Sequence, residues 1–300
     1  MKSSALAMLL LSIFAPALHA ASCKLCLYGP DNMAFDAAGN VYLVDTDHKN
    51  HSRVLKLSPT GDVLADWRVF EAVPGRNNGP DGIALDRDGN ILVVDRGRDQ
   101  ILKLSPNGKV LSRFRGFPAR AFDFGGHVAV GKDGDVYGVA AASNLILKFS
   151  PQGKLLATWH RSQGAGLDQW NHPETISIDT SGDLVIADWG NVRILTIAPD
   201  GHTVRAFAAV PNEPLKVSSV SGSAVGPDGN IYVADYQLYR IQEFDAQGHL
   251  LATIGNTRGN ILFKTAPSSL AIDAKGYLYS ADGLSVVKYS RDGKLLARWQ

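Results

Sequence analysis

The sequence predicts an all-β chain, a six-bladed β-propeller built from four-stranded antiparallel blades. Two observations support this prediction. The motif Asp-x-x-Gly-Asn, or a remnant of it, occurs six times, and its turn glycines recur every 45 to 50 residues, the length of a four-stranded blade. Each copy consists of short β-branched runs separated by turn residues, without helical periodicity. The turn glycines are Gly39, Gly89, Gly134, Gly182, Gly229 and Gly276.

The second copy, residues 79–114, shows the order of the strands within a blade. Strands are expected at 83–86, 91–95, 101–104 and 110–114. Gly89 and Gly108 occupy the tight turns after the first and third strands, where glycine accepts a positive φ without steric cost. Because successive strands are antiparallel, both tight turns lie on one face of the ring. The loops after the second strands and the connections between blades share the opposite face, the loop face, where we expect function to lie.

The start of the chain has the features of an export signal. Residues 1–20 combine the charged Lys2, an apolar run and a small-residue end, as in a signal peptide. A short segment, 21–28, then precedes one propeller domain over 29–300. No later run reaches membrane length, so we expect a soluble protein exported to the periplasm or beyond the cell. An uncleaved N-terminal anchor is the alternative.

The two cysteines, Cys23 and Cys26, follow the expected cleavage point. In an exported protein they are expected to form a local disulfide. A lipid anchor on Cys23 is the alternative, since residues 20–23 resemble a lipoprotein cleavage box. Leu27 stands where a haem attachment motif needs histidine, which excludes that motif.

The overall charge of the chain gives no reason to expect nucleic acid as a partner. The chain has 30 Lys and Arg against 29 Asp and Glu, a formal net charge of +1. Such a balance gives no general attraction to nucleic acid, and none is expected as a partner. An electrostatic site must therefore be local.

Two kinds of residue recur for structural reasons. An aspartate ends the second strand of most copies and is expected to accept backbone N–H bonds that organise the next loop. A bulky residue ends the fourth strand and is expected to pack between blades or along the outer edge of the ring. The aspartates are Asp45, Asp95, Asp188, Asp235 and Asp282, and the bulky residues are Trp67, Phe114, Trp159, Phe207, Ile254 and Trp299.

Polar residues break the repeat where the first strands begin, at the mouth of the pore. Asp31, Asn32, Asp81, His127 and Glu174 converge there from different blades. Crowded carboxylates are relieved by protonation, by arginine or by a divalent cation. Oxygen ligands favour calcium, magnesium or manganese over zinc, so Asp31, Asn32, Asp81 and Glu174 are candidate ligands of one ion. His127 and Glu174 are the candidate catalytic residues. The alternative is that these acids are merely solvated.

Basic and aromatic residues on the loop face are candidates for binding a partner. They are Arg53, Arg96, Arg98, Arg120, Trp189 and Tyr236. Arginines placed there could hold an anionic ligand or an acidic partner. Ordinary solvated loop charge is the alternative interpretation.

The repeat resembles the NHL repeat, a six-bladed propeller family, over essentially the whole mature chain. The resemblance rests on Gly79-Pro80-x-Gly82-Ile83-Ala84, Asp86-x-x-Gly89-Asn90 and Val94-Asp95. The third copy departs most, with Gly131 for the first aspartate and Ala140-Ala141 where other copies carry an aspartate. The resemblance implies either a binding domain or a metal enzyme, such as the amidating lyases and the related lactonases and virginiamycin-type lyases.

Two functional hypotheses follow. The first is an exported scaffold that binds a protein, peptide or glycan on its loop face. The second is a metal-dependent lactonase or lyase with its site at the pore mouth. The sequence contains no nucleophile elbow, zinc-protease motif or phosphate-binding loop to decide between them.

Overall fold

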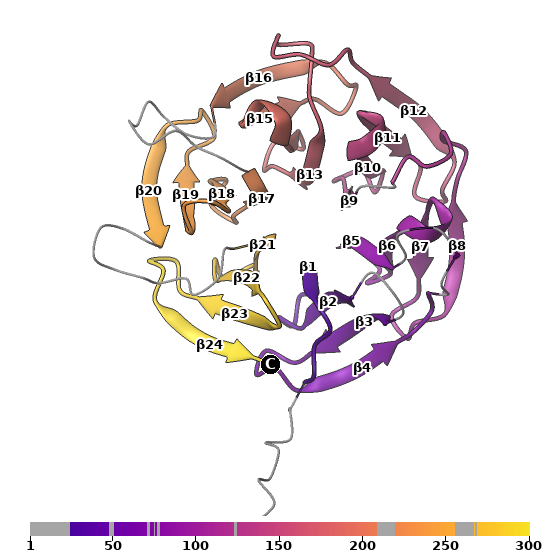
Figure 1. The fold of residues 1–300 in the computed structure, drawn as a ribbon, viewed down its shortest axis with the longest axis vertical. Coiled ribbons are helices and arrows are strands. Elements are labelled where there is room, and N and C mark those ends of the chain that lie inside the picture. Colours follow the sequence, from indigo (N-terminus) through magenta and orange to yellow (C-terminus); the bar gives the residue numbers. More distant parts are fainter. Residues whose placement is uncertain are drawn as a thin grey trace, which may run out of the picture.

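The computed structural model is a ring of six four-stranded antiparallel sheets around a central axis (Figure 1). It describes residues 25–47, 51–70, 73–74, 76, 79–122, 125–208, 220–255, 267 and 269–300. In every blade the strands pair in chain order, the first lying at the axis and the fourth at the rim. The predicted fold class is confirmed.

The blades are numbered in chain order and have the following bounds. Blade 1 contains β1 (Pro30–Phe35), β2 (Val41–Thr46), β3 (Ser52–Leu57) and β4 (Val63–Trp67); blade 2 contains β5 (Pro80–Leu85), β6 (Ile91–Asp95), β7 (Gln100–Leu104) and β8 (Val110–Phe114). Blade 3 contains β9 (Gly126–Val130), β10 (Val136–Ala140), β11 (Leu145–Phe149) and β12 (Leu155–His160); blade 4 contains β13 (Pro173–Ile178), β14 (Leu184–Asp188), β15 (Arg193–Ile197) and β16 (Thr203–Ala208). Blade 5 contains β17 (Val220–Val225), β18 (Ile231–Asp235), β19 (Arg240–Phe244) and β20 (Leu250–Gly255); blade 6 contains β21 (Ser269–Ile272), β22 (Leu278–Asp282), β23 (Ser285–Tyr289) and β24 (Leu295–Trp299).

Short 3₁₀ helices follow the second strand in three blades. They are η1 (Arg96–Arg98) in blade 2, η2 (Ala141–Ser143) in blade 3 and η3 (Trp189–Asn191) in blade 4. Each ends at a residue in the left-handed region, Asp99, Asn144 or Val192. No helix among the described residues is both long and apolar enough to cross a membrane.

The bulky residues at the ends of the fourth strands pack between blades, as the sequence predicts. The ring of Trp67 lies against Gly108 in the last turn of the next blade, so closely that any side chain at Gly108 would collide with it. Gly108 also has a φ of 82°, which glycine accepts freely. The same contact repeats around the ring, as Gly61 with Trp299, Gly153 with Phe114, Gly201 with Trp159, Gly248 with Phe207 and Gly293 with Ile254.

The ring closes through contact between its two ends. Leu25 and Leu27, which precede β1, are buried in one apolar cluster with Trp299 of β24 and Val286 of β23. The cluster also contains Met33 of β1. Figure 1 accordingly places the C-terminal end of the chain against blade 1.

The aspartates at the ends of the second strands accept hydrogen bonds from backbone amides. Asp45 accepts the amides of Tyr28 and Gly29 at 2.7 and 2.9 Å. Asp188 accepts the amide of Asn171 at 2.6 Å, and Asp235 that of Leu238 at 3.2 Å. Of these three aspartates, only Asp235 bonds the loop that follows its strand, as predicted. Asp45 and Asp188 instead hold the segment that enters the first strand of their own blade. The side chain of Asp282 lies outside the described residues.

Candidate functional site

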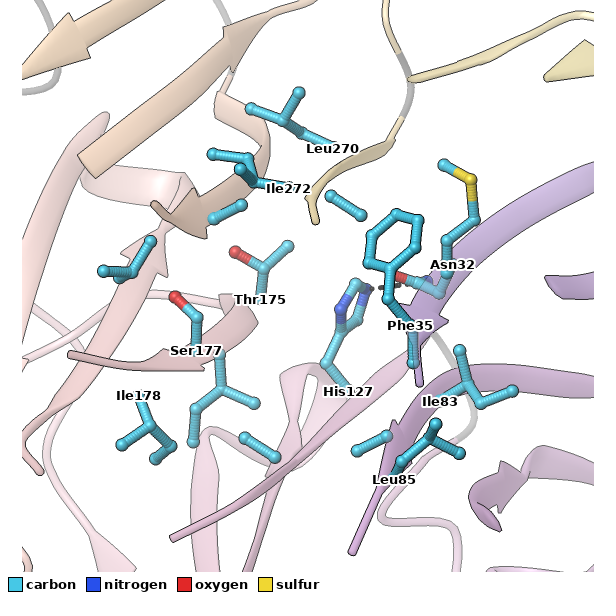
Figure 2. A pocket seen from close by; sticks show the side chains of 18 of the residues that line it. Asn32, Phe35, Ile83, Leu85, His127, Thr175, Ser177, Ile178, Leu270 and Ile272 are labelled. Atoms are coloured by element: carbon cyan, nitrogen blue, oxygen red, sulfur yellow. Dashed lines mark hydrogen bonds between the residues drawn. The ribbon is translucent and has the colours of Figure 1, made fainter. Parts of the chain in front are cut away.

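The six inner strands surround a central cavity of about 430 Å³ (Figure 2). A ring of small side chains lines its middle, one from each blade: Ala34, Ala84, Ala129, Ser177, Ala224 and Ala271. Cavities of this size are typical of ligand sites. The small residues keep the axis open, as their recurrence at one position of the repeat suggests.

The cavity changes in polarity along the axis. Near the tight turns its lining is mostly apolar, with Asp36 as the one acidic residue beside Phe35, Leu85, Val130, Ile178, Val225 and Ile272. Toward the loop face the lining becomes polar, with Asn32, His127, Thr175, Ser223 and Ser269. The hydroxyls of Thr175 and Ser223 are 2.6 Å apart and form a bond between neighbouring blades, which the repeat pattern does not predict. The chemistry is therefore concentrated at the loop-face end, the pore mouth.

Interruptions in strand pairing mark the residues of the pore mouth. Between β1 and β2 the register shifts between Pro30 and Met33, so that Asp31 and Asn32 lie at a bulge. Equivalent shifts occur at Asp81 in β5 and at Glu174 in β13. Bulges redirect side chains and are common beside active sites. In β9 the pairing is regular, and His127 stands directly opposite Val139.

His127 of blade 3 and Asn32 of blade 1 contact each other. The Asn32 side-chain amide lies 3.3 Å from Nε2 of His127 (Figure 2). Because an N–H can only donate, Nε2 accepts in this arrangement and the ring is neutral. Burial lowers the pKa of His127, although the charge of Asp81 acts in the opposite direction. A neutral imidazole at this position is able to accept a proton.

Asp31 holds a proton at neutral pH. Burial, then the negative charges of Asp81 and Glu174, and a hydrogen bond with the Asp81 carboxyl raise the pKa of Asp31 to about 8, despite an opposing effect of Arg96. Asp31 and Asp81 thus form a carboxyl–carboxylate pair. The backbone of Asp31 is fixed as well, since its carbonyl accepts the hydroxyl of Ser269 from blade 6 at 2.8 Å.

Glu174 titrates close to neutral pH. Burial and the charge of Asp81 raise the pKa of Glu174 to about 7. A group with such a pKa exchanges protons readily at physiological pH, as general acids and bases must. The two carboxyls therefore differ about tenfold in proton affinity, and Asp31 is the more protonated of the two at neutral pH.

Asp81 is the buried centre of the cluster. Its side chain accepts the amide of Gly126 at 2.8 Å, and Nη1 of Arg96 lies 3.8 Å away. Only 5% of Asp81 is exposed. The sequence placed Arg96 among the partner-binding arginines of the loop face, but the structure brings it to the pore mouth. The start of η1 directly after β6 turns its side chain inward, which the repeat pattern alone does not reveal.

The types of residue at the pore mouth suit a divalent cation, but their arrangement in space does not. Its carboxyl and amide oxygens are the donors that calcium, magnesium and manganese prefer. Among the described residues, however, no three His, Cys, Asp or Glu side chains form a group suited to hold a metal ion. We therefore derive no chemical step through a metal. The assignment of Asp31, Asn32, Asp81 and Glu174 as ligands stays a prediction, which the metal content of the purified protein would test.

The other predicted binding residues differ in accessibility. Arg53 is 7% exposed, and its guanidinium bonds Asp45 at 2.7 Å, Asp66 at 3.1 Å and the carbonyl of Cys26 at 2.8 Å. These contacts are internal and hold the segment before β1. Trp189 and Tyr236 are 42% and 49% exposed, and so can meet a partner.

The remaining predicted residues lie at the loop face or beyond the described part of the chain. Arg98 is partly buried in η1, and Arg120 is exposed with its amide bonded to Asp99 at 2.6 Å. Cys26 is exposed, but Cys23 lies outside the described residues, as does the segment 1–20. The disulfide and the signal peptide stay predictions.

Comparison with known families gives a partial match. A family model described as the SMP-30/gluconolactonase/LRE-like region matches residues 32–127. This is a propeller family related to the one that the repeat resembles, and the NHL assignment itself stays a prediction. No curated protein matches the chain.

Several solved structures share the fold over nearly the whole chain. A streptogramin B lyase aligns with a TM-score of 0.67 at 16% identity, covering 92% of this chain and 84% of that chain. Virginiamycin B lyase from Staphylococcus aureus aligns at 0.64 and 14%, covering 91% and 84%. A protein of unknown function from Bacteroides thetaiotaomicron aligns at 0.64 and 15%, covering 91% and 69%. At such identities the likeness shows the fold alone, and this chain is similar in architecture to six-bladed lyases.

Proposed function

We propose that the protein is a lyase- or lactonase-like enzyme that opens a cyclic ester at the pore mouth. The observation that supports this proposal is the convergence of Asp31, Asp81, Glu174 and His127 at the pore mouth, where His127 also lines the central cavity. Four blades contribute these groups. The raised pKa values of Asp31 and Glu174 give the site groups that hold and release protons near neutral pH.

Cleavage of the C–O bond of an ester ring needs one group that accepts a proton and another that donates one. Glu174, once ionised, takes a proton either from carbon, in an elimination, or from an attacking water, in a hydrolysis. Asp31, which is protonated at neutral pH, donates to the leaving oxygen. His127, whose Nε2 accepts the Asn32 amide, becomes a second proton acceptor only when that bond opens. Asp81 stays between the two carboxyls and raises the pKa of both.

The comparisons support the reaction class at a coarse level. The matched family region begins at Asn32 and ends at His127, so it includes the two residues that bond across the pore mouth. The family description names a gluconolactonase, and two of the similar structures are named as lyases, of streptogramin B and of virginiamycin B. The proposal nevertheless rests on the pore-mouth geometry, because similarity at this identity carries only the fold.

The test is incubation of the purified protein with a panel of lactones and with a streptogramin B, followed by mass spectrometry. Elimination leaves the mass of the substrate unchanged, whereas hydrolysis adds one water. Glu174→Gln and His127→Ala should each lower turnover at least about 100-fold, while Arg120→Gln on the exposed loop should not. Absence of turnover across the panel, or full activity in both pore variants, would contradict the proposal.

A binding scaffold is the second candidate, favoured by exposed aromatic residues. Trp189, Tyr236 and Tyr239 are 42%, 49% and 39% exposed. Aromatic side chains that are partly in water are common anchors at interfaces. If this function is correct, Trp189→Ser combined with Tyr236→Ser should abolish capture of a protein, peptide or glycan partner and leave ester cleavage unchanged.

Export is proposed from the segment 1–20. Cell fractionation should find the protein outside the cytoplasm, and the mature N-terminus should lie near Ala21. Intact mass would show a Cys23–Cys26 disulfide as the loss of two hydrogens. A cytoplasmic protein that keeps Met1 would refute export.

A further inference from the structure

Blade 3 differs from its neighbours directly after the second strand. Blade 2 carries Asp95 and Arg96 there, and blade 4 carries Asp188 and Trp189. Blade 3 has Ala140 and Ala141 at the equivalent positions, followed by Ala142. A charged side chain and a large side chain are thus replaced by methyl groups, and the aspartate that organises the loop in other blades is missing.

Asn144 organises the loop in its place. It ends η2 in the left-handed region, with a φ of 55°. Its side-chain amide donates to the carbonyls of Arg161 and Trp170 at 2.9 and 3.2 Å, and its oxygen accepts the amide of His172 at 3.1 Å. The indole of Trp170 donates back to the Asn144 carbonyl at 2.9 Å. The loop is therefore fixed although the aspartate is absent.

The missing side chains leave a pocket of about 230 Å³ between η2 and the connection from blade 3 to blade 4. Its volume equals that of about eight waters, at ~30 Å³ each, and suits a single sugar ring. The lining consists of Ala141, Ala142, Asn144, His160, Arg161, Gln163, Asn171 and His172. The pocket shares no lining residue with the central cavity.

The pocket contains one permanent positive charge and no carboxylate. The guanidinium of Arg161 lies 5.5 Å from the centre of the buried Trp170 ring, and one nitrogen donates to the carbonyl of Gly201 at 3.3 Å. No ion pair of Arg161 occurs in the part of the chain that the structure describes. A guanidinium held against an aromatic ring and lacking an acid nearby is ready to bind a carboxylate.

Neutral polar groups surround the charge. Gln163 donates to the side-chain oxygen of Asn171 at 2.6 Å, which leaves the Gln163 oxygen as an acceptor and the Asn171 amide as a donor. Burial lowers the pKa of His172, so its neutral ring offers both a donor and an acceptor. The exposed ring of Trp189 lies 5.5 Å from that of His172 and extends the wall of the site. Mixed donors and acceptors of this kind match hydroxyl groups.

We propose that this pocket binds a sugar acid, that is, a monosaccharide-sized ligand with one carboxylate and several hydroxyls. Its carboxylate pairs with Arg161, and its hydroxyls bond Gln163, Asn171 and His172. The site is separate from the pore mouth and does not depend on the reaction proposed there.

Isothermal titration of the full protein with glucuronate tests the proposal. Glucose, which lacks the carboxylate, and acetate, which lacks the hydroxyls, are the comparison ligands. Glucuronate should bind at least about tenfold more tightly than either, since a charge-assisted hydrogen bond is worth about 1.5–3 kcal/mol. Equal affinity for glucuronate and glucose, or no binding of glucuronate, would overturn the proposal.

Two variants locate the binding. Arg161→Gln removes the charge, and Ala142→Leu fills the pocket while keeping the charge. Each should weaken glucuronate binding at least about tenfold. Arg113→Gln, an exposed arginine on β8, is the matched control and should bind as the parent does. Since Arg161→Gln disturbs the contact with Trp170, thermal unfolding should be compared. Unchanged binding by a folded Ala142→Leu would refute the location.

Discussion

The amide of Leu25 donates to the carbonyl of Gln300 at 3.2 Å, so the start of the described chain bonds its last residue. The bond lies beside the apolar cluster that joins Leu25 and Leu27 to Trp299. Blade 6 consists of strands that are contiguous in sequence. The ring is therefore closed by side-chain packing and this terminal bond, and not by a strand exchanged between blades.

Removing the closing side chain should destabilise the whole domain. Trp299 is 9% exposed and packs against Tyr279 and Gly61. Trp299→Ala should cost about 3–5 kcal/mol and lower the unfolding temperature by about 10 °C. Leu296→Ala, on the same strand but 46% exposed, is the control and should change stability by less than about 0.5 kcal/mol. Deleting residues 295–300 should be more severe than either. An unchanged thermal transition after that deletion would rule out closure by β24.

The pore-mouth carboxyls should produce a narrow pH optimum for the proposed reaction. Activity should rise as Glu174 loses its proton at about pH 7 and fall as Asp31 loses its own at about pH 8. Glu174→Gln should lower kcat/KM by about 10²–10⁴-fold and remove the rising limb. It should also move the falling limb to lower pH, because the charge of Glu174 raises the pKa of Asp31. A pH–rate profile of the variant with both limbs in place would contradict these roles.

Asp31 should make the fold less stable as the pH rises. Its pKa is about 8 in the folded protein against an ordinary value of 3.8, so between these values the folded state binds more protons than the unfolded state. The free energy of unfolding then falls with increasing pH. Asp31→Asn should lack this contribution. Its free energy of unfolding should exceed that of the parent by about 1–2 kcal/mol at pH 8.5 and differ little from it at pH 4. Urea titrations at both pH values measure it. Asp88→Asn, at an exposed turn, is the control, and parallel stability curves for Asp31→Asn and the parent would disprove the argument.

The buried ion pair at the end of β14 should stabilise the fold far more than an exposed ion pair of similar length does. Asp188 is fully buried and lies 2.7 Å from Arg193, which in turn bonds carbonyls of the connection between blades 3 and 4. Asp188→Asn leaves the Arg193 charge without its partner and should cost about 3 kcal/mol. It should also expose residues 163–171 to limited proteolysis. Asp200→Asn removes an exposed pair with His202 and should change neither measurement.

The sequence was sufficient to predict the fold because the determinants repeat. The turn glycines that recur in it all adopt a positive φ, from 75° at Gly89 to 100° at Gly182. In blade 2 the predicted strands 91–95 and 110–114 coincide with β6 and β8. Because the pattern occurs six times, the fold can be predicted even though one copy departs from it.

The position of the candidate site on the axis could be predicted from the sequence, but the protonation of its residues could not. Asp31, Asp81, His127 and Glu174 were found because they break the repeat at one level of the axis. Their protonation depends on burial and on distances across blades, which no local pattern contains. Arg53 and Arg96 are alike in sequence context, yet one supports the N-terminal segment and the other reaches the pore mouth. The direction of a long side chain is decided by its neighbours in three dimensions.

The contact between each rim residue and the turn glycine of the next blade has a consequence for how the chain can be rearranged. Trp299 meets Gly61 across the chain ends in the same way that Trp67 meets Gly108 within the chain. The ring thus has no structural first blade. A circular permutant that links residue 300 to residue 25 and opens in the exposed turn near Asp88 would retain all six contacts and should fold to the same ring.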